Sequence, residues 1–103
     1  MTYKLIISRE VHDDIDAIVG YMVSELNSPA AAKGFLDDVD EGFRYMESNP
    51  FIYSLCPDAR LAVKGIRKVV IKNYLILFRV DEKTSSVFVL RIVYGRKNYA
   101  GMI

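Results

Sequence analysis

The chain has no tryptophan, one cysteine, one histidine and three prolines among 103 residues. The single cysteine, Cys56, excludes an internal disulfide and indicates a reducing compartment. Apolar runs are short: the longest, residues 74–78, is far below the roughly 20 residues that a membrane span requires. Lys4 is followed by only three apolar residues, so no secretory signal is expected. These absences predict a cytoplasmic protein that makes no contact with a membrane.

Signals for common catalytic and cofactor sites are also missing. The sequence has no glycine-rich phosphate loop, no serine-nucleophile elbow and no zinc-ligand spacing. His12 and Asp16 lie four residues apart, but two candidate ligands do not make a metal site. Asp37 and Glu41 are neighbours on a predicted helix, and we interpret this acidic cluster as a solvated face. We therefore expect no metal and no cofactor.

The charge is divided unevenly between the two halves of the chain, although the net charge is only +1. Residues 1–59 carry four basic and eleven acidic side chains, whereas residues 60–103 carry ten basic and two acidic ones. The balances are −7 and +8. A basic pole of this kind suits a polyanion or an acidic partner. The hydrophobic content of 51% is enough for a core, and the length fits a single domain.

Two amphipathic helices are predicted from apolar residues at three- and four-residue spacing. The first covers residues 9–25, with Ser8 as its N-cap. The second has Ser28 as its N-cap and Pro29 at the first helical position, where the missing N–H costs nothing. Asn49-Pro50 ends it. Because the connecting loop is short, we expect an antiparallel αα-hairpin.

Strands are predicted on both sides of this hairpin. A short strand at residues 3–8 precedes it, and residues 66–71, 74–80 and 86–93 follow as three more strands. Residues 51–64 are expected to be irregular, and residues 95–103 to form a tail that is mobile at its end. The order β-α-α-β-β-β predicts an α+β fold, with the hairpin packed on one face of an antiparallel sheet.

Both faces of the predicted sheet are apolar, which normally means that both are covered. The face away from the helices is expected to carry Val69, Leu75, Leu77, Val89 and Val93 together with Arg67, Arg79 and Arg91. A monomer rarely exposes so large an apolar patch, so we expect a partner chain to cover it, with the C-terminal tail as the alternative. A different register, with the arginines at strand edges, is the other interpretation.

Several segments together resemble the C-terminal signature of the RelE/ParE toxin superfamily. They are Gly65-Ile66-Arg67-Lys68, residues 73–80 and residues 89–99. The start of the second helix at residues 27–31, followed by Phe35, and its end at residues 47–50 resemble the same family. The match covers nearly the whole chain, which we read as one toxin domain over residues 1–103. The resemblance implies a bacterial type II toxin that stabilises plasmids or arrests growth, neutralised by an acidic antitoxin that wraps around it.

The resemblance leaves two kinds of action open. RelE-like members cleave mRNA in the ribosome, whereas ParE-like members poison DNA gyrase. Metal-independent RNA cleavage needs a proton acceptor, a proton donor and cations on the scissile phosphate. In the RelE scheme, Arg67 or Lys68 would supply the second-strand cations, and Arg96 and Tyr99 would form the C-terminal pair.

Two features depart from the RelE scheme. Leu75 follows Tyr74 where RelE-like toxins have an arginine, and no histidine lies near Tyr94. The loss of a phosphate clamp favours a ParE-like, gyrase-directed toxin that is not an enzyme. The alternatives are a RelE-like mRNA endonuclease and a basic RNA-binding module without toxicity.

The residues expected to contact the target or the antitoxin come from the basic half and its strands. They are Arg67, Arg79, Arg91, Arg96, Leu75 and Leu77. A simpler interpretation is that the strand arginines only solubilise the sheet, or pair with Asp81 and Glu82.

Overall fold

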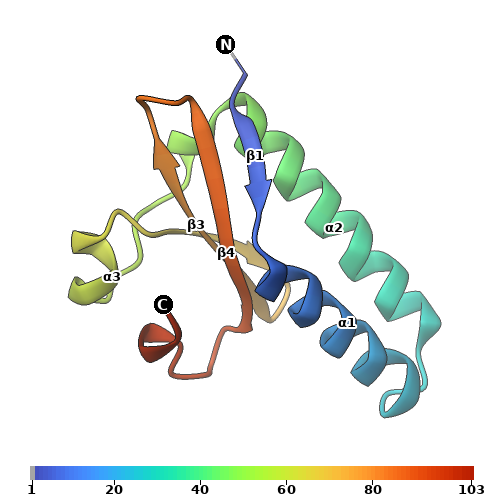
Figure 1. Ribbon diagram of the computed structural model, residues 1–103. Helices are drawn as coiled ribbons and strands as arrows, with labels where there is room; N and C mark the ends of the chain where they lie inside the picture. Colours follow the sequence, from blue (N-terminus) through green and yellow to red (C-terminus); the bar gives the residue numbers. More distant parts are fainter. Residues whose placement is uncertain (1) are drawn as a thin grey trace.

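The computed structural model describes residues 2–103 as a four-stranded sheet with two long helices on one side (Figure 1). The elements in chain order are β1 (Lys4–Ile7), α1 (Arg9–Ser24), α2 (Pro29–Ser48), the 3-10 helix η1 (Pro50–Ile52), α3 (Ala59–Val63), β2 (Arg67–Ile71), β3 (Tyr74–Asp81), β4 (Ser86–Tyr94) and the 3-10 helix η2 (Ala100–Met102). Figure 1 shows α1 and α2 as an antiparallel hairpin, with α3 and the C-terminal end away from it. The predicted α+β fold is confirmed.

The ends of the two long helices follow the capping signals of the sequence. The hydroxyl of Ser8 accepts a hydrogen bond from the Val11 N–H at 3.3 Å, and that of Ser28 accepts one from the Ala31 N–H at 3.1 Å. Pro29 is the first residue of α2, and the helix stops before Asn49. No helix within residues 2–103 is long and apolar enough to cross a membrane.

The strand order of the sheet is β1-β4-β3-β2. β2, β3 and β4 are antiparallel neighbours, as expected, whereas β1 runs parallel to β4. The sheet is therefore mixed. Parallel neighbours need a long connection, and the helical hairpin is the first part of that connection between β1 and β4.

The main core lies between the sheet and the helical hairpin. Its buried residues are Val11, Met22, Ala32, Phe35, Val39, Met46, Val69, Ile71, Ile76, Phe78, Val87, Val89 and Ile92. The prediction that Val69 and Val89 face away from the helices is wrong. Val69 lies directly opposite Ile76 and shares its face.

A β-bulge explains the position of Val89. Leu77 lies opposite Arg91 while Phe78 lies opposite Val89, so Leu90 is an extra residue in β4. The bulge shifts the alternation of side chains by one position. Val89 before it and Ile92 after it therefore both face the helices.

A second, smaller core lies on the other face of the sheet. It contains Cys56, Leu61, Ile66, Leu75, Leu77 and Val93, with Tyr99, Ala100, Met102 and Ile103 packed against it. Leu75, Leu77 and Val93 were correctly expected on this face. The expected partner chain is not needed to cover them, because the chain's own tail and α3 do so. The segment expected to be irregular thus contains a helix, capped by Asp58, whose carboxylate accepts from the Arg60 N–H at 2.9 Å.

Candidate target-binding face

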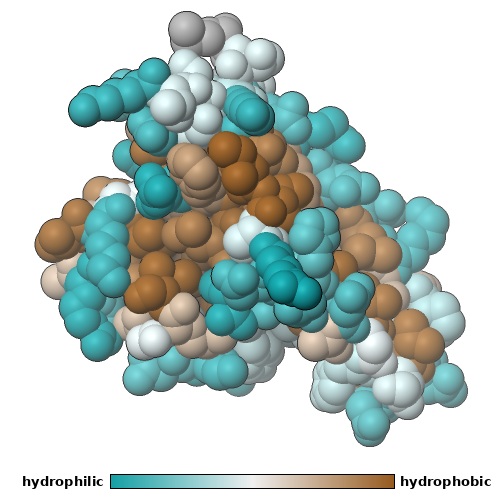
Figure 2. Space-filling view, in the orientation of Figure 1, coloured by the Kyte–Doolittle hydropathy of each residue, from teal (hydrophilic) through white to brown (hydrophobic). Residues whose placement is uncertain are grey.

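The candidate site is the sheet face turned away from α1 and α2, together with the tail at residues 95–103, whose last residues, from Tyr99 on, lie over part of it. We call it the tail-side face. In Figure 2, hydrophobic residues gather over the strands and beside α3, with hydrophilic residues around them. Phe88 and Leu90 remain partly exposed there. The face thus combines an apolar floor with surrounding polar side chains.

Arg79 is the best-placed cation of the tail-side face. β3 alternates, so Arg79 shares the face of Leu75 and Leu77. Its guanidinium carbon lies 4.4 Å from the ring centroid of Phe88, which is its direct neighbour on β4. A cation over an aromatic ring is held in place without losing its charge. Arg79 forms no ion pair with any residue of 2–103, including Asp81 and Glu82.

Arg67 and Lys68 begin β2 and point in opposite directions. Arg67 lies two residues before Val69 in β2, so both side chains point to the same face of the sheet. The Nη1 of Arg67 donates a hydrogen bond to the Tyr53 carbonyl at 2.6 Å. Its guanidinium also lies 5.0 Å from the Phe51 ring centroid. The expectation that Arg67 faces away from the helices is therefore wrong. Lys68 lies on the tail-side face, half-buried.

Arg91 is bound to the first helix. Its Nε and Nη2 each donate to a carboxylate oxygen of Asp14 at 2.8 Å. Asp14 also accepts from the Ile92 N–H at 2.9 Å, in the part of β4 that β1 no longer reaches. The hydrogen bonds to Asp14 raise the pKa of Arg91, against the opposing effect of burial. The ion pair neutralises the charge of Arg91 and joins β4 to α1, so the observed contact of Arg91 is a structural one.

The two predicted apolar contact residues are covered. Leu75 is 7% exposed and Leu77 is fully buried. A partner could reach them only if residues 99–103 moved away. Cys56, beneath the same cover, has its pKa raised by burial, an effect that the charge of Lys68 partly offsets.

The tail carries the last two predicted site residues. Arg96 is exposed and forms no ion pair within residues 2–103. Tyr99 is half-buried against the second core, and burial is the main cause that raises its pKa. Lys64 fastens the end of the tail, because its Nζ donates to the Ile103 carbonyl at 3.2 Å.

The predicted site residues therefore do not converge on one point. Arg79, Lys68 and the tail share the tail-side face, whereas Arg67 lies across the sheet and Arg91 is paired. The sequence analysis missed Phe88 as the platform for Arg79, and strand pairing of β3 with β4 could have suggested it. Within residues 2–103, no group of three or more His, Cys, Asp or Glu side chains could hold a metal ion.

A known protein family matches most of the chain. The family model for the ParE toxin of the type II toxin–antitoxin system parDE matches residues 5–99. No protein of curated function matches the chain.

Solved structures share the fold. The toxin fold of a chromosomal ParDE toxin–antitoxin system from P. aeruginosa superposes with a TM-score of 0.70 at 23% identity, over 90% of this chain and 96% of that one. A free-state double arginine-to-alanine variant of the E. coli toxin RelE superposes with a TM-score of 0.67 at 10% identity, over 99% of this chain and 93% of that one. A chain of the RelBE2 toxin–antitoxin complex of Mycobacterium tuberculosis superposes with a TM-score of 0.61 at 14% identity, over 91% of this chain and 99% of that one. At these identities the likeness shows the fold alone.

Proposed function

The chain belongs to the ParE toxin family of type II toxin–antitoxin systems, and on this premise we propose that it arrests growth by acting on DNA gyrase through the tail-side face. Gyrase is proposed from the kind of action that the ParE branch implies. The geometry supports a contact surface, because Arg79 stacks on the partly exposed Phe88 and forms no ion pair within residues 2–103.

The observation that carries the proposal is the stacked and unpaired Arg79. Its position over Phe88 places a fixed positive charge beside exposed apolar surface. Arginine and aromatic residues together are typical of the residues that contribute most to protein interfaces. Arg96 adds a second free charge from the tail. An acidic target surface would meet both.

The arrangement favours this action over RNA cleavage. Cleavage by general acid and base needs groups whose pKa values lie near the working pH. Burial raises the pKa of Tyr99, which moves this pKa further away from the working pH. Arg67, one of the two candidate second-strand cations, lies across the sheet from the tail. Leu75, in place of the expected arginine, is buried.

The partner that neutralises the toxin is a cognate antitoxin, as in the toxin–antitoxin complexes with this fold. We propose that its acidic segment covers Arg79 and Arg96. An acidic segment would gain charge complementarity there, and it would block the surface that the target needs. This proposal leaves Leu75 and Leu77 under the tail.

The test is to induce the chain alone in a bacterium and follow DNA topology and transcript 5′ ends over the first minutes. The proposal predicts growth arrest with relaxed or broken DNA and intact transcripts. New 5′ ends within the codons of translated messages would instead make the chain an mRNA endonuclease. Growth without arrest would leave a binding module, and both of these results would overturn the proposal.

A further inference from the structure

A second surface consists of the free edge of β2 and the groove between this strand and α2. β2 is the last strand of the sheet, and residues 54–55 pair only with its beginning, where the Lys68 N–H donates to the Ser54 carbonyl at 3.2 Å. Backbone groups alternate in direction along a strand. The N–H and C=O of Val70 therefore point away from β3, as those of Lys68 do.

These two backbone groups are available for pairing. Within residues 2–103, neither the N–H nor the C=O of Val70 has a hydrogen-bond partner beyond β3. Val70 is 65% exposed. Proteins usually block such an edge with charge, proline or a bulge, and this stretch of β2 has a valine. It is a template for one more strand.

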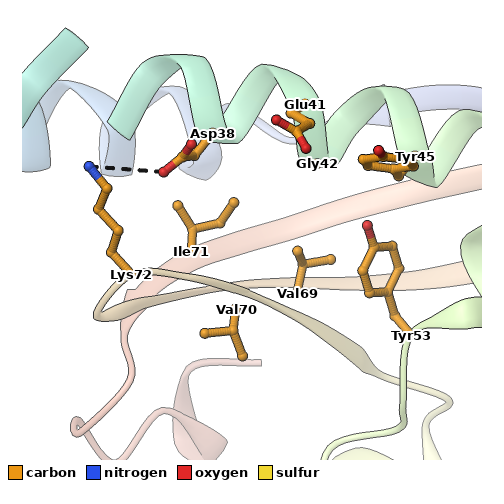
Figure 3. Close-up of a pocket in the computed structure, with 9 residues that line it drawn as sticks. All are labelled: Asp38, Glu41, Gly42, Tyr45, Tyr53, Val69, Val70, Ile71 and Lys72. Atoms are coloured by element: carbon orange, nitrogen blue, oxygen red, sulfur yellow. Dashed lines mark ion pairs between the residues drawn. The ribbon is translucent and has the colours of Figure 1, made fainter. Parts of the chain in front are cut away.

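A groove of about 290 Å³ runs beside this edge, between α2 and β2 (Figure 3). Asp38, Glu41 and Tyr45 reach into it from α2, and Tyr53 points towards Tyr45 from the other side. Val69 and Ile71 line the side formed by β2. A strand added to β2 would direct every second side chain into this groove, because side chains alternate between faces.

Two carboxylates and one ammonium group, that of Lys72, line the groove, so its net charge is negative. Asp38 has only a long contact with Lys72, at 3.9 Å, and Glu41 forms no ion pair with any of the described residues. Burial first, then Tyr45 and Glu41, raise the pKa of Tyr53, which agrees with a carboxylate facing the two rings. A long basic side chain could lay its aliphatic stem along the tyrosines and bring its charge to Glu41.

We propose that the β2 edge docks an extended segment of a partner protein that carries Lys or Arg at alternate positions. The segment pairs with the N–H and C=O of Val70, and its basic side chains enter the groove towards Asp38 and Glu41. The groove lies on the helix side of the sheet and has the opposite charge preference to the tail-side face. The proposal therefore does not depend on the action on gyrase.

A second copy of the chain is the less suitable occupant. Two β2 strands paired antiparallel about Val70 would form one continuous sheet with both α2 helices on the same face. The carboxylates of Asp38 and Glu41 would then face their counterparts, and like charges in contact oppose association. The groove favours a basic partner.

The proposal can be tested with the full, isotopically labelled chain and a synthetic peptide. The probe is Thr-Lys-Val-Lys-Val-Lys-Thr with blocked ends, which places its lysines on one face of a strand. Amide NMR shifts are followed up to about 5 mM peptide, which covers affinities into the millimolar range. The Val70 amide should shift most. A peptide with glutamate in place of lysine should bind at least about tenfold more weakly.

Three variants sharpen the test. Val70→Pro removes the outward N–H and no hydrogen bond to β3, and it should abolish the shifts. Val70→Thr keeps the N–H and should bind as the original chain does. Glu41→Gln should weaken binding by about threefold. Glu41→Gln, which changes only the helix side, should still arrest growth, and this separates the groove from the proposed function.

Several results would overturn the proposal. They are equal binding of the two peptides, unchanged binding by Val70→Pro, shifts centred away from β2, and no shifts with the lysine peptide. A concentration-dependent dimer that Val70→Pro dissolves would also overturn it, in favour of a second copy. The charge-swapped peptide keeps the test decisive if Val70→Pro does not fold.

Discussion

The two faces of the sheet are covered in different ways. The helix side has 36 helical residues in α1 and α2, with capped ends, over thirteen buried core residues. The tail side has the five residues of α3 and a short C-terminal segment over six buried residues. The first face supplies most of the hydrophobic stabilisation, since that stabilisation scales with buried apolar area. The second face has a thin cover and free cations, and there we place the toxic action.

The largest effect should come from the centre of the helix side. Phe35 is fully buried and stacks edge-on with Tyr74, with the ring centroids 5.3 Å apart. Phe35→Ala should lower the free energy of unfolding by about 3–5 kcal/mol, because it leaves a cavity. Urea denaturation measures this loss of stability. Leu36→Ala, at a neighbouring and more exposed position, is the control. A loss below about 1 kcal/mol would mean that the helix side is not the main core.

The contact between the faces should give the next largest effect. Asp14→Ala removes both hydrogen bonds from Arg91 and the acceptor for the Ile92 N–H. We expect a loss of about 1–3 kcal/mol, because a partly buried cation and a backbone donor are left without a partner. The exposed neighbour Asp13→Ala should change little. Equal stability of the two variants would show that the ion pair does not hold β4 to α1.

A smaller gain is expected on the helix side. Gly20 lies inside α1, and a Cβ there would meet nothing within 4 Å. Gly20→Ala should raise the free energy of unfolding by about 0.5–1 kcal/mol, because alanine loses less backbone entropy in a helix. Gly95→Ala is the contrasting variant. Its Cβ would lie 3.2 Å from the Asn73 carbonyl oxygen, so this substitution should lower the free energy of unfolding. A thermal denaturation series would contradict this account if the two changes had the same sign.

The smallest effect is a local pH dependence on the tail side. The hydrogen bond to Arg60 is the main cause that lowers the pKa of Asp58, the N-cap of α3. The contribution of this carboxylate is therefore complete above its ordinary pKa of about 4 and is lost as the pH falls through the lower, folded value. Amide exchange in α3 should increase over that range. Asp58→Asn, which caps without titrating, should flatten the profile, and an unchanged profile would exclude Asp58 as the cause.

Local signals in the sequence were sufficient for the two long helices and the order of the strands along the chain, but not for α3. Ser8, Ser28 and Pro29 mark helix starts through contacts within three residues, so a sequence alone can reveal them. The face of each strand residue was harder to predict. The bulge at Leu90 shifts the alternation by one residue, and only the pairing with β3 places it.

The site was predicted less well because its contacts are long-range. Asp14 and Arg91 are 77 residues apart, and no local pattern connects them. Arg67 lies on the helix side because it is paired with Phe78 of β3, and there it meets the Tyr53 carbonyl of the segment after α2. The tail was correctly considered as a cover, but its packing on Leu75 and Leu77 depends on the folded sheet.

The most direct test of the central claim uses purified gyrase and the purified chain in a DNA supercoiling assay. The double variant Arg79→Ala with Arg96→Ala is compared with the original chain and with Arg44→Ala, which removes an exposed arginine from the helix side. The account predicts inhibition by the original chain and by Arg44→Ala, and loss of inhibition in the folded double variant. Full inhibition by the double variant, or none by the original chain, would contradict the claim that the tail-side face acts on gyrase.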